Sequence, residues 1–144
     1  MAKIEVQESL MKHSFGVASK CYEEALKETE NEEFARKMYL LGLIHDIGRA
    51  FDNNNHEKAG AEVIRSISFN ELQFLADAIA AHGTPRKDMT KWERLLKLGD
   101  IQVNAQGEEV SFKERLEDIK ERYGGASGNY ERAKRQVEVL KNAR

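Results

Sequence analysis

The sequence predicts an all-α protein of six to seven helices, and three observations support this fold class. Apolar residues recur at steps of three and four along most of the 144-residue chain, which is the spacing of one helix face. No segment shows the alternation of apolar and polar residues that is typical of a β-strand. The only proline is Pro85, so little in the chain interrupts a helix. We expect residues 1–144 to form one domain, because this length suits a single buried core.

The first two predicted helices each have an extensive apolar face. The first covers residues 6–28. Its apolar face consists of Leu10, His13, Val17 and Cys21. The second begins after the N-cap residue Asn31, where two glutamates suit the positive end of a helix dipole. It continues to Ile47, and Gly48 is a typical C-terminal stop.

The sequence pattern in the middle of the chain predicts two shorter helices that are separated by loops. The loop FDNNN at residues 51–55 precedes a third helix at residues 56–66. The fourth helix takes Asn70 as its N-cap and ends near Ala81, before a loop at residues 82–89. Loops carry function more often than buried elements do, so residues at these helix ends are candidates for a site.

Two capping-box patterns predict the fifth and sixth helices. Thr90 with Glu93 begins the fifth, which reaches Val103, and Ser111 with Glu114 begins the sixth. Several leucines in the fifth helix indicate that it is buried.

A glycine-rich stretch, GGASG at residues 124–128, separates a core at about residues 6–123 from a final helix at about residues 129–142. Residues 131–144 carry five lysines and arginines against two glutamates. We interpret this surplus as a solvated helix face.

Composition limits the classes of function. The net charge of −2, from 23 basic and 25 acidic residues, argues against a nucleic-acid partner. No apolar run approaches the ~20 residues that span a bilayer, and the first residues lack the apolar segment of a secretory signal. We therefore expect a cytoplasmic protein with no membrane partner, and no pattern indicates an oligomeric state. Cys21 is the only cysteine, which excludes an internal disulfide and argues against a Cys-based metal site.

His45 and Asp46 stand at the end of the most apolar stretch of the chain, LLGLIHDIGR at residues 40–49. A helix that is apolar nearly all round is buried, and a buried carboxylate must be paired or must bind a metal ion. Taken alone, the pair is best interpreted as a core histidine bonded to a backbone carbonyl and an aspartate that caps the next turn.

The other histidines favour a metal site. His13 lies on an apolar helix face, His56 begins a helix and His82 ends one, while Asp100 closes another apolar run. Imidazole together with carboxylate suits Fe, Mn, Zn, Co or Ni. Four histidines and two aspartates exceed the needs of one tetrahedral ion, so they predict two divalent transition-metal ions with Asp46 between them. Two such ions can clamp the attacking and leaving oxygens of a phosphoester displacement.

Other motifs of catalysis and binding are incomplete. HEKAG at residues 56–60 begins like the zincin motif HExxH but has Gly60 in place of the second histidine. DNNNHE, which starts at Asp52, lacks the glycine of an EF-hand loop. Neither a P-loop nor a GxGxxG motif occurs. The position of Cys21 on an apolar helix face favours packing over nucleophilic chemistry.

The ordered set H…HD…H…H…D resembles the HD-domain superfamily of metal-dependent phosphohydrolases. The segments HSFGVA, LIHDIG and HEKAGAE look like family motifs, and the resemblance covers about residues 10–103. It implies the HD-domain helical fold, with the helices arranged around a metal site. The implied ligands of the first ion are His13, His45, Asp46 and Asp100, and those of the second ion are Asp46, His56 and His82.

Within that superfamily the chain most resembles the small hydrolases that split diadenosine tetraphosphate. It is less similar to the HD-GYP phosphodiesterases, because Gly83 rather than a second histidine follows His82. The segment after Asp100 departs from the diadenosine-polyphosphate branch. The resemblance implies that a metal-activated water cleaves a phosphoester or phosphoanhydride bond of a nucleotide or a related small phosphorylated substrate.

Three cations are candidates for contact with phosphate. Arg49 stands where the family motif HDIGK has lysine, and its planar fork suits phosphate oxygens. The predicted catalytic residues are Asp46 and Arg49, and the predicted substrate-binding residues are Arg49, Arg86 and Lys87. Arg86 and Lys87 are equally consistent with a solvated loop. Phe51 and Trp92 could stack on a base, although core packing is the commoner role of such rings.

Three other functions are open at this stage. A non-catalytic regulatory HD module would bind metal and nucleotide without turnover. A helical adaptor would bind no metal and would use its basic final helix as a contact surface. A metal-dependent oxygenase would consume oxygen in the presence of iron.

Overall fold

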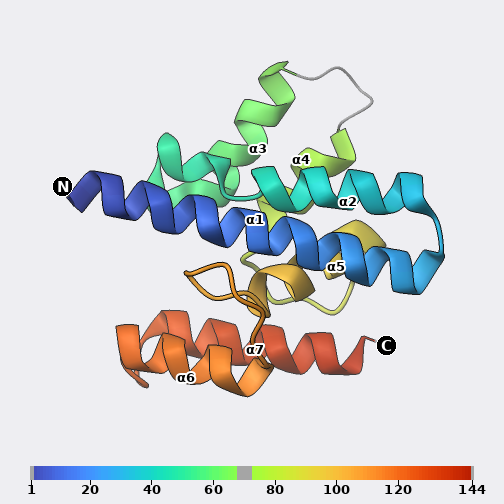
Figure 1. Cartoon of the computed structure of the whole chain (residues 1–144). Helices are drawn as coiled ribbons and strands as arrows, with labels where there is room; N and C mark the ends of the chain where they lie inside the picture. The colour runs from blue at the N-terminus through green and yellow to red at the C-terminus, as the bar shows by residue number, and fades with distance from the viewer. Residues whose placement is uncertain (1, 68–72, 144) are drawn as a thin grey trace.

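The computed structural model describes residues 2–67 and 73–143, and its elements confirm the all-α prediction (Figure 1). The described residues form seven α-helices and two short 3-10 helices, and their β-structure is limited to one isolated bridge between Val103 and Glu109. In chain order the elements are α1 (Ala2–Thr29), α2 (Glu32–Ile44), η1 (Ile47–Ala50), η2 (Asn53–Asn55), α3 (His56–Ile67), α4 (Gln73–Ala81), α5 (Lys91–Ile101), α6 (Phe112–Tyr123) and α7 (Gly128–Asn142). Among the described helices, none is both long and apolar enough to cross a membrane.

Helices α1 and α2 run antiparallel and pack closely side by side (Figure 1). Gly42 makes the close approach possible, because a Cβ at this position would lie 2.8 Å from the Cα of Ala18. The approach brings the C-terminal end of α2, which His45 directly follows, against the middle of α1.

Helix α5 lies at the centre of the fold and contacts α1, α2, α4 and α7. The main apolar core lies against one side of α5 and includes Val17, Met38, Leu41, Leu75 and Leu96. A second apolar cluster covers its other side, where α6 and α7 form a pair below α5 in Figure 1. The second cluster consists of Leu98, Ile101, Ala133, Val137 and Leu140, with partly buried neighbours from α6. The prediction that the fifth helix is buried is therefore confirmed.

Two of the predicted helix caps are confirmed. The side chain of Asn31 accepts a hydrogen bond from the backbone N–H of Phe34 at 3.1 Å. Ser111 and Glu114 form both hydrogen bonds of a capping box, at 3.1 and 3.3 Å. The predicted cap Asn70 lies outside the described residues.

The capping box predicted at Thr90 is only half formed. The hydroxyl of Thr90 accepts a hydrogen bond from the backbone N–H of Glu93, but the Glu93 carboxylate turns away and binds Arg86 and Lys97. The ammonium group of Lys97 also donates to the carbonyl of Thr84. This buried ion cluster ties the loop before α5 to the helix itself, and it outweighs the local reciprocal cap.

We expect Glu93→Ala to lower the free energy of unfolding by about 3 kcal/mol, because it leaves the buried ammonium of Lys97 without its counter-charge. The matched control is Glu32→Ala, which removes an exposed ion pair with Arg36 and should change stability little. Urea unfolding of both variants measures the difference. Equal stability of the two variants would contradict the prediction.

The predicted end of the second helix is wrong. Helix α2 ends at Ile44, His45 and Asp46 form a turn, and η1 follows from Ile47. The backbone of Asp46 leaves the helical region, with φ −103° and ψ 14°. Gly48 therefore does not stop α2, and packs against α3 instead. The predicted loop at residues 51–55 likewise contains the short helix η2.

Candidate metal centre

The six side chains that the sequence predicts as metal ligands converge from five parts of the chain. His13 comes from α1, His45 and Asp46 from the turn after α2, His56 from the start of α3, His82 from the end of α4, and Asp100 from the last turn of α5. They form two groups that could each hold an ion. One group is His13, His45, Asp46 and Asp100, and the other is Asp46, His56 and His82. Within each group the candidate ligand atoms all lie within 4.8 Å of one another.

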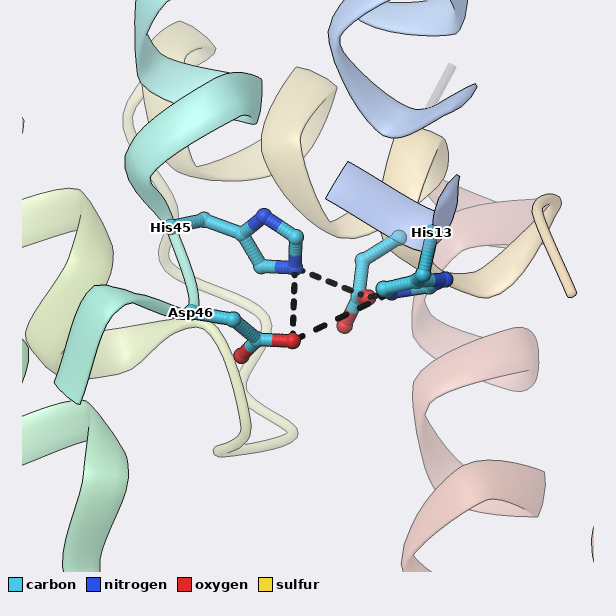
Figure 2. Close-up of side chains that lie close together, drawn as sticks. His13, His45 and Asp46 are labelled. Atoms are coloured by element: carbon cyan, nitrogen blue, oxygen red, sulfur yellow. Dashed lines mark hydrogen bonds and ion pairs between the residues drawn. The ribbon is translucent and has the colours of Figure 1, made fainter. Parts of the chain in front are cut away.

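The first group gathers its histidine nitrogens around two carboxylates. Nε2 of His13 lies 2.8 Å from Oδ1 of Asp100, and Nε2 of His45 lies 3.2 Å from the same oxygen. Nε2 of His45 is also 3.3 Å from Oδ2 of Asp46 (Figure 2). Figure 2 shows the side chains of His13, His45 and Asp46 pointing toward one common centre.

The second group forms around the other oxygen of Asp46. Oδ1 of Asp46 lies 3.3 Å from Nε2 of His56 and 3.3 Å from Nε2 of His82. The two imidazole nitrogens are themselves 3.3 Å apart. Asp46 thus directs Oδ2 toward the first group and Oδ1 toward the second.

Backbone carbonyls hold three of the histidine rings by their other nitrogen. Nδ1 of His13 lies 3.0 Å from the carbonyl of Asn104. Nδ1 of His45 and of His82 each lie 2.6 Å from the carbonyl three residues earlier. In a neutral ring, an Nδ1–H that donates to a carbonyl leaves Nε2 with its lone pair toward the centre, as in metal-ligating histidines. The two interpretations of His45, a carbonyl-bonded core histidine and a metal ligand, therefore apply to different nitrogens of the same ring.

The donor set fits a divalent cation. Oδ1 of Asp46 is buried and has no hydrogen-bond donor among the described residues, and it faces Nε2 of His82. Two acceptor atoms that face each other in a buried place are unfavourable unless a cation or a proton lies between them. Imidazole and carboxylate are the ligands that divalent transition metals prefer.

In the first group, the positive charge on histidine and the negative charges on the two aspartates stabilise one another. Burial opposes a charge on His45, but the carboxylates of Asp46 and Asp100 outweigh burial and raise the pKa of His45 well above its ordinary value. Burial likewise opposes ionisation of both aspartates, but the facing histidines hold the pKa of Asp46 and of Asp100 well below the usual range. Both carboxylates are therefore ionised and available to a metal.

His56 differs from His45 in its protonation. Burial and the positive charge of Arg49 lower the pKa of His56 below its ordinary value. The ring is consequently neutral at pH 7, which is the form that binds a metal ion.

We expect metal affinity at the first group to fall as the pH is lowered. Without metal, His45 is protonated below its raised pKa, so an ion must displace that proton, at a penalty of roughly tenfold per pH unit. Titration calorimetry with Mn²⁺ at pH 7, in two buffers of different ionisation enthalpy, should report roughly one proton released. Heats that do not depend on the buffer would contradict this expectation.

The three cations predicted to contact phosphate lie in different surroundings. Nε of Arg49 is 3.3 Å from Oδ2 of Asp46, and its side chain is 37% exposed, so it lies at the rim of the cluster. The guanidinium of Arg86 is held by both carboxylate oxygens of Glu93. Lys87 is exposed, and within the described part of the chain it makes no hydrogen bond or ion pair. Of these three, the structure brings Arg49 to the ligands.

The two aromatic candidates also differ. Trp92 packs edge-on against Phe34, with 4.6 Å between ring centroids, and lies against the main core. Phe51 is 69% exposed and follows Arg49 by two residues. Core packing is therefore the role of Trp92, whereas the ring of Phe51 remains accessible.

Comparison with known proteins gives one match. A family model, the HD domain, matches residues 10–123 of this chain. Neither the curated proteins nor the solved structures contain a match to it. The matched range includes all six candidate ligands and Arg49, and it ends before α7.

Proposed function

The chain belongs to the HD domain family, whose members are generally metal-dependent phosphohydrolases, and from this premise we infer that it hydrolyses a phosphoester or phosphoanhydride bond. The substrate we propose is a nucleotide or a related small phosphorylated molecule. The observation that carries this proposal is the position of Asp46, which directs one carboxylate oxygen toward each group of candidate ligands.

Two groups that share one carboxylate support a centre of two ions. His13, His45, Asp46 and Asp100 would hold the first ion, and Asp46, His56 and His82 would hold the second. Such ions, when bound, supply a water of lowered pKa as the nucleophile and offset charge on phosphoryl oxygens. The described residues around the centre favour Fe, Mn, Zn, Co or Ni, because their donor atoms are imidazole nitrogens and carboxylate oxygens.

Arg49 is the residue that we propose to bind the phosphate. Its Nε contacts Asp46 and its terminal nitrogen donates to Oδ1 of Asn53 at 2.9 Å, so the fork is held at the rim of the centre. A guanidinium in this place can donate two parallel hydrogen bonds to phosphate oxygens.

We expect Arg49→Ala to lower kcat/KM roughly ten- to a hundredfold, since a hydrogen bond to a charged group contributes about 1.5–3 kcal/mol. Metal content should stay at the wild-type level, because the six candidate ligands are unchanged. Arg49→Lys is the matched control: it keeps the charge but loses the fork, so it should restore activity only in part. Steady-state kinetics and elemental analysis measure the two effects. Wild-type kinetics in Arg49→Ala would contradict the role.

A panel of phosphorylated compounds tests the proposed function. The protein is loaded with Mn²⁺ or Fe²⁺ and incubated with diadenosine tetraphosphate, nucleoside mono- and triphosphates and a cyclic dinucleotide. The expected result is hydrolysis of at least one member, detected by chromatographic separation of its nucleotide products, with diadenosine tetraphosphate tested first because of the family branch that the motifs resemble. A protein that binds two ions but turns over no member would instead be a non-catalytic regulatory module. Iron-dependent oxygen consumption would indicate an oxygenase.

A further inference from the structure

Helix α7 carries a buried polar side chain that reaches the candidate metal centre. Gln136 is 8% exposed, and its Nε2 donates a hydrogen bond of 2.8 Å to the backbone carbonyl of His82. Its neighbours on the same face, Ala133, Val137 and Leu140, belong to the apolar cluster against α5. The residue lies beyond position 123, where the match to the HD domain ends.

Within the described part of the chain, the hydrogen bond from Gln136 is the one that supplies a donor to this carbonyl. His82 directly follows α4, and carbonyls at a helix end have no partner within the helix. His82 is only 3% exposed, so the carbonyl must find its donor inside the protein. Gln136 provides this donor from a helix 54 positions further along the chain.

His82 is thereby held at three points. Its ring Nδ1 lies 2.6 Å from the carbonyl of Ile79, its backbone N–H donates to the same carbonyl at 3.3 Å, and its own carbonyl accepts from Gln136. The first two contacts are local to the end of α4. Of these three contacts, the third is the one that joins the backbone of His82 to a distant helix.

We propose that Gln136 is a positioning residue for the second ion. By holding the backbone of His82, it keeps Nε2 of that ring 3.3 Å from Oδ1 of Asp46 and from Nε2 of His56. Helix α7 is then part of the metal centre although it supplies no ligand. This inference rests on the two-ion centre of the proposed function.

The test compares Gln136→Met with Val137→Ala in the full chain. Methionine keeps the length of the side chain but lacks the N–H donor, whereas Val137→Ala loosens the packing of α7 and leaves the hydrogen bond in place. Metal-free protein is titrated with Mn²⁺ by calorimetry, and thermal unfolding is recorded alongside. We expect Gln136→Met to lower the affinity for the second ion about 10–100-fold, which is the usual effect of removing a hydrogen-bond partner of a metal ligand. The affinity for the first ion should not change. Val137→Ala should unfold at a lower temperature but bind both ions like wild type.

The outcomes separate this inference from the proposed function. If wild type and Gln136→Met bind both ions equally, the role of Gln136 is wrong and the two-ion centre stands. If Val137→Ala weakens the second ion as much as Gln136→Met, packing of α7 rather than the hydrogen bond is responsible, and the inference is again wrong. If wild type binds fewer than two ions, the two-ion centre itself fails. Gln136→Leu, which also lacks the donor, replaces Gln136→Met where the latter does not fold.

Discussion

Asp46→Ala is expected to remove both ions and to abolish hydrolysis. Among the described residues, Asp46 alone belongs to both groups of candidate ligands, and the side chain of alanine offers neither group an oxygen. Loss of several kcal/mol of transition-state stabilisation from the metals corresponds to a fall in kcat of roughly a thousandfold or more. Elemental analysis of protein purified without chelators, together with turnover of the best substrate, measures both effects.

The control for this variant is Asp77→Ala. Asp77 is an exposed aspartate of α4 that pairs with Arg65, outside the candidate ligand groups. The Asp77→Ala variant should keep full metal content and activity. This result would show that the loss of metal in Asp46→Ala depends on the position of the carboxylate and not on the removal of any one carboxylate. Wild-type metal content in Asp46→Ala would contradict the bridging role that we assign to this residue.

Gly48→Ala is expected to unfold the protein more readily and to remove the second ion. A Cβ at this position would overlap the carbonyl oxygen of His56 and would lie 2.5 Å from the backbone nitrogen of Gly60. Both obstacles are backbone atoms, so η1 and α3 must move apart, at a cost of about 3 kcal/mol. The same movement separates Asp46 from His56, which lie on either side of this contact.

Gly128→Ala provides the control, because a Cβ there meets nothing within 4 Å. Urea unfolding and Mn²⁺ titration of the two alanine variants give the comparison. We expect the first ion to remain in Gly48→Ala, because His13, His45 and Asp100 are not in the displaced contact. A Gly48→Ala protein with normal stability and two ions would show that the contact with α3 does not position the ligands.

The helical fold could be predicted from the sequence because its signals are local. Asn31 and Ser111 cap their helices as the residue types predict, since each cap depends only on neighbours three residues away. The box at Thr90 is only half formed because the Glu93 carboxylate pairs with Lys97, four positions later on the same helix, and with Arg86 from the preceding loop. These ion pairs replace the hydrogen bond that the glutamate of a capping box makes to the backbone of the N-cap residue.

The end of α2 was misplaced because the apolar pattern continues beyond it. Ile47 keeps the helical spacing, so nothing in the run indicates that the backbone leaves the helix at Asp46. Just after the turn, Gly48 packs on the backbone of His56, a contact between segments that periodicity does not describe. It is also the turn that lets Asp46 face both ligand groups.

The candidate ligands could be named from the sequence, but their partners could not. The ordered histidines and aspartates carry the family pattern, whereas the carbonyls that hold their rings belong to residues without any chemical signature, such as Asn104. Gln136 was missed because the final helix was interpreted as a solvated basic face. The signal that could have found it is a polar residue within the stripe of Ala133, Val137 and Leu140.

The wide spread of the candidate ligands along the chain would also link metal supply to the lifetime of the protein. His13 and Asp100 are 87 positions apart, and His56 and His82 are 26 apart, so an unfolded chain presents no preformed group of donors. Ions would therefore bind the native state almost exclusively. By mass action, an ion whose free concentration is a hundred times its Kd adds about 2.7 kcal/mol to the free energy of unfolding. A newly synthesised chain could not acquire its first ion until α5 had joined α1 and α2, and a cell short of metal would hold less of the protein as well as a less active one.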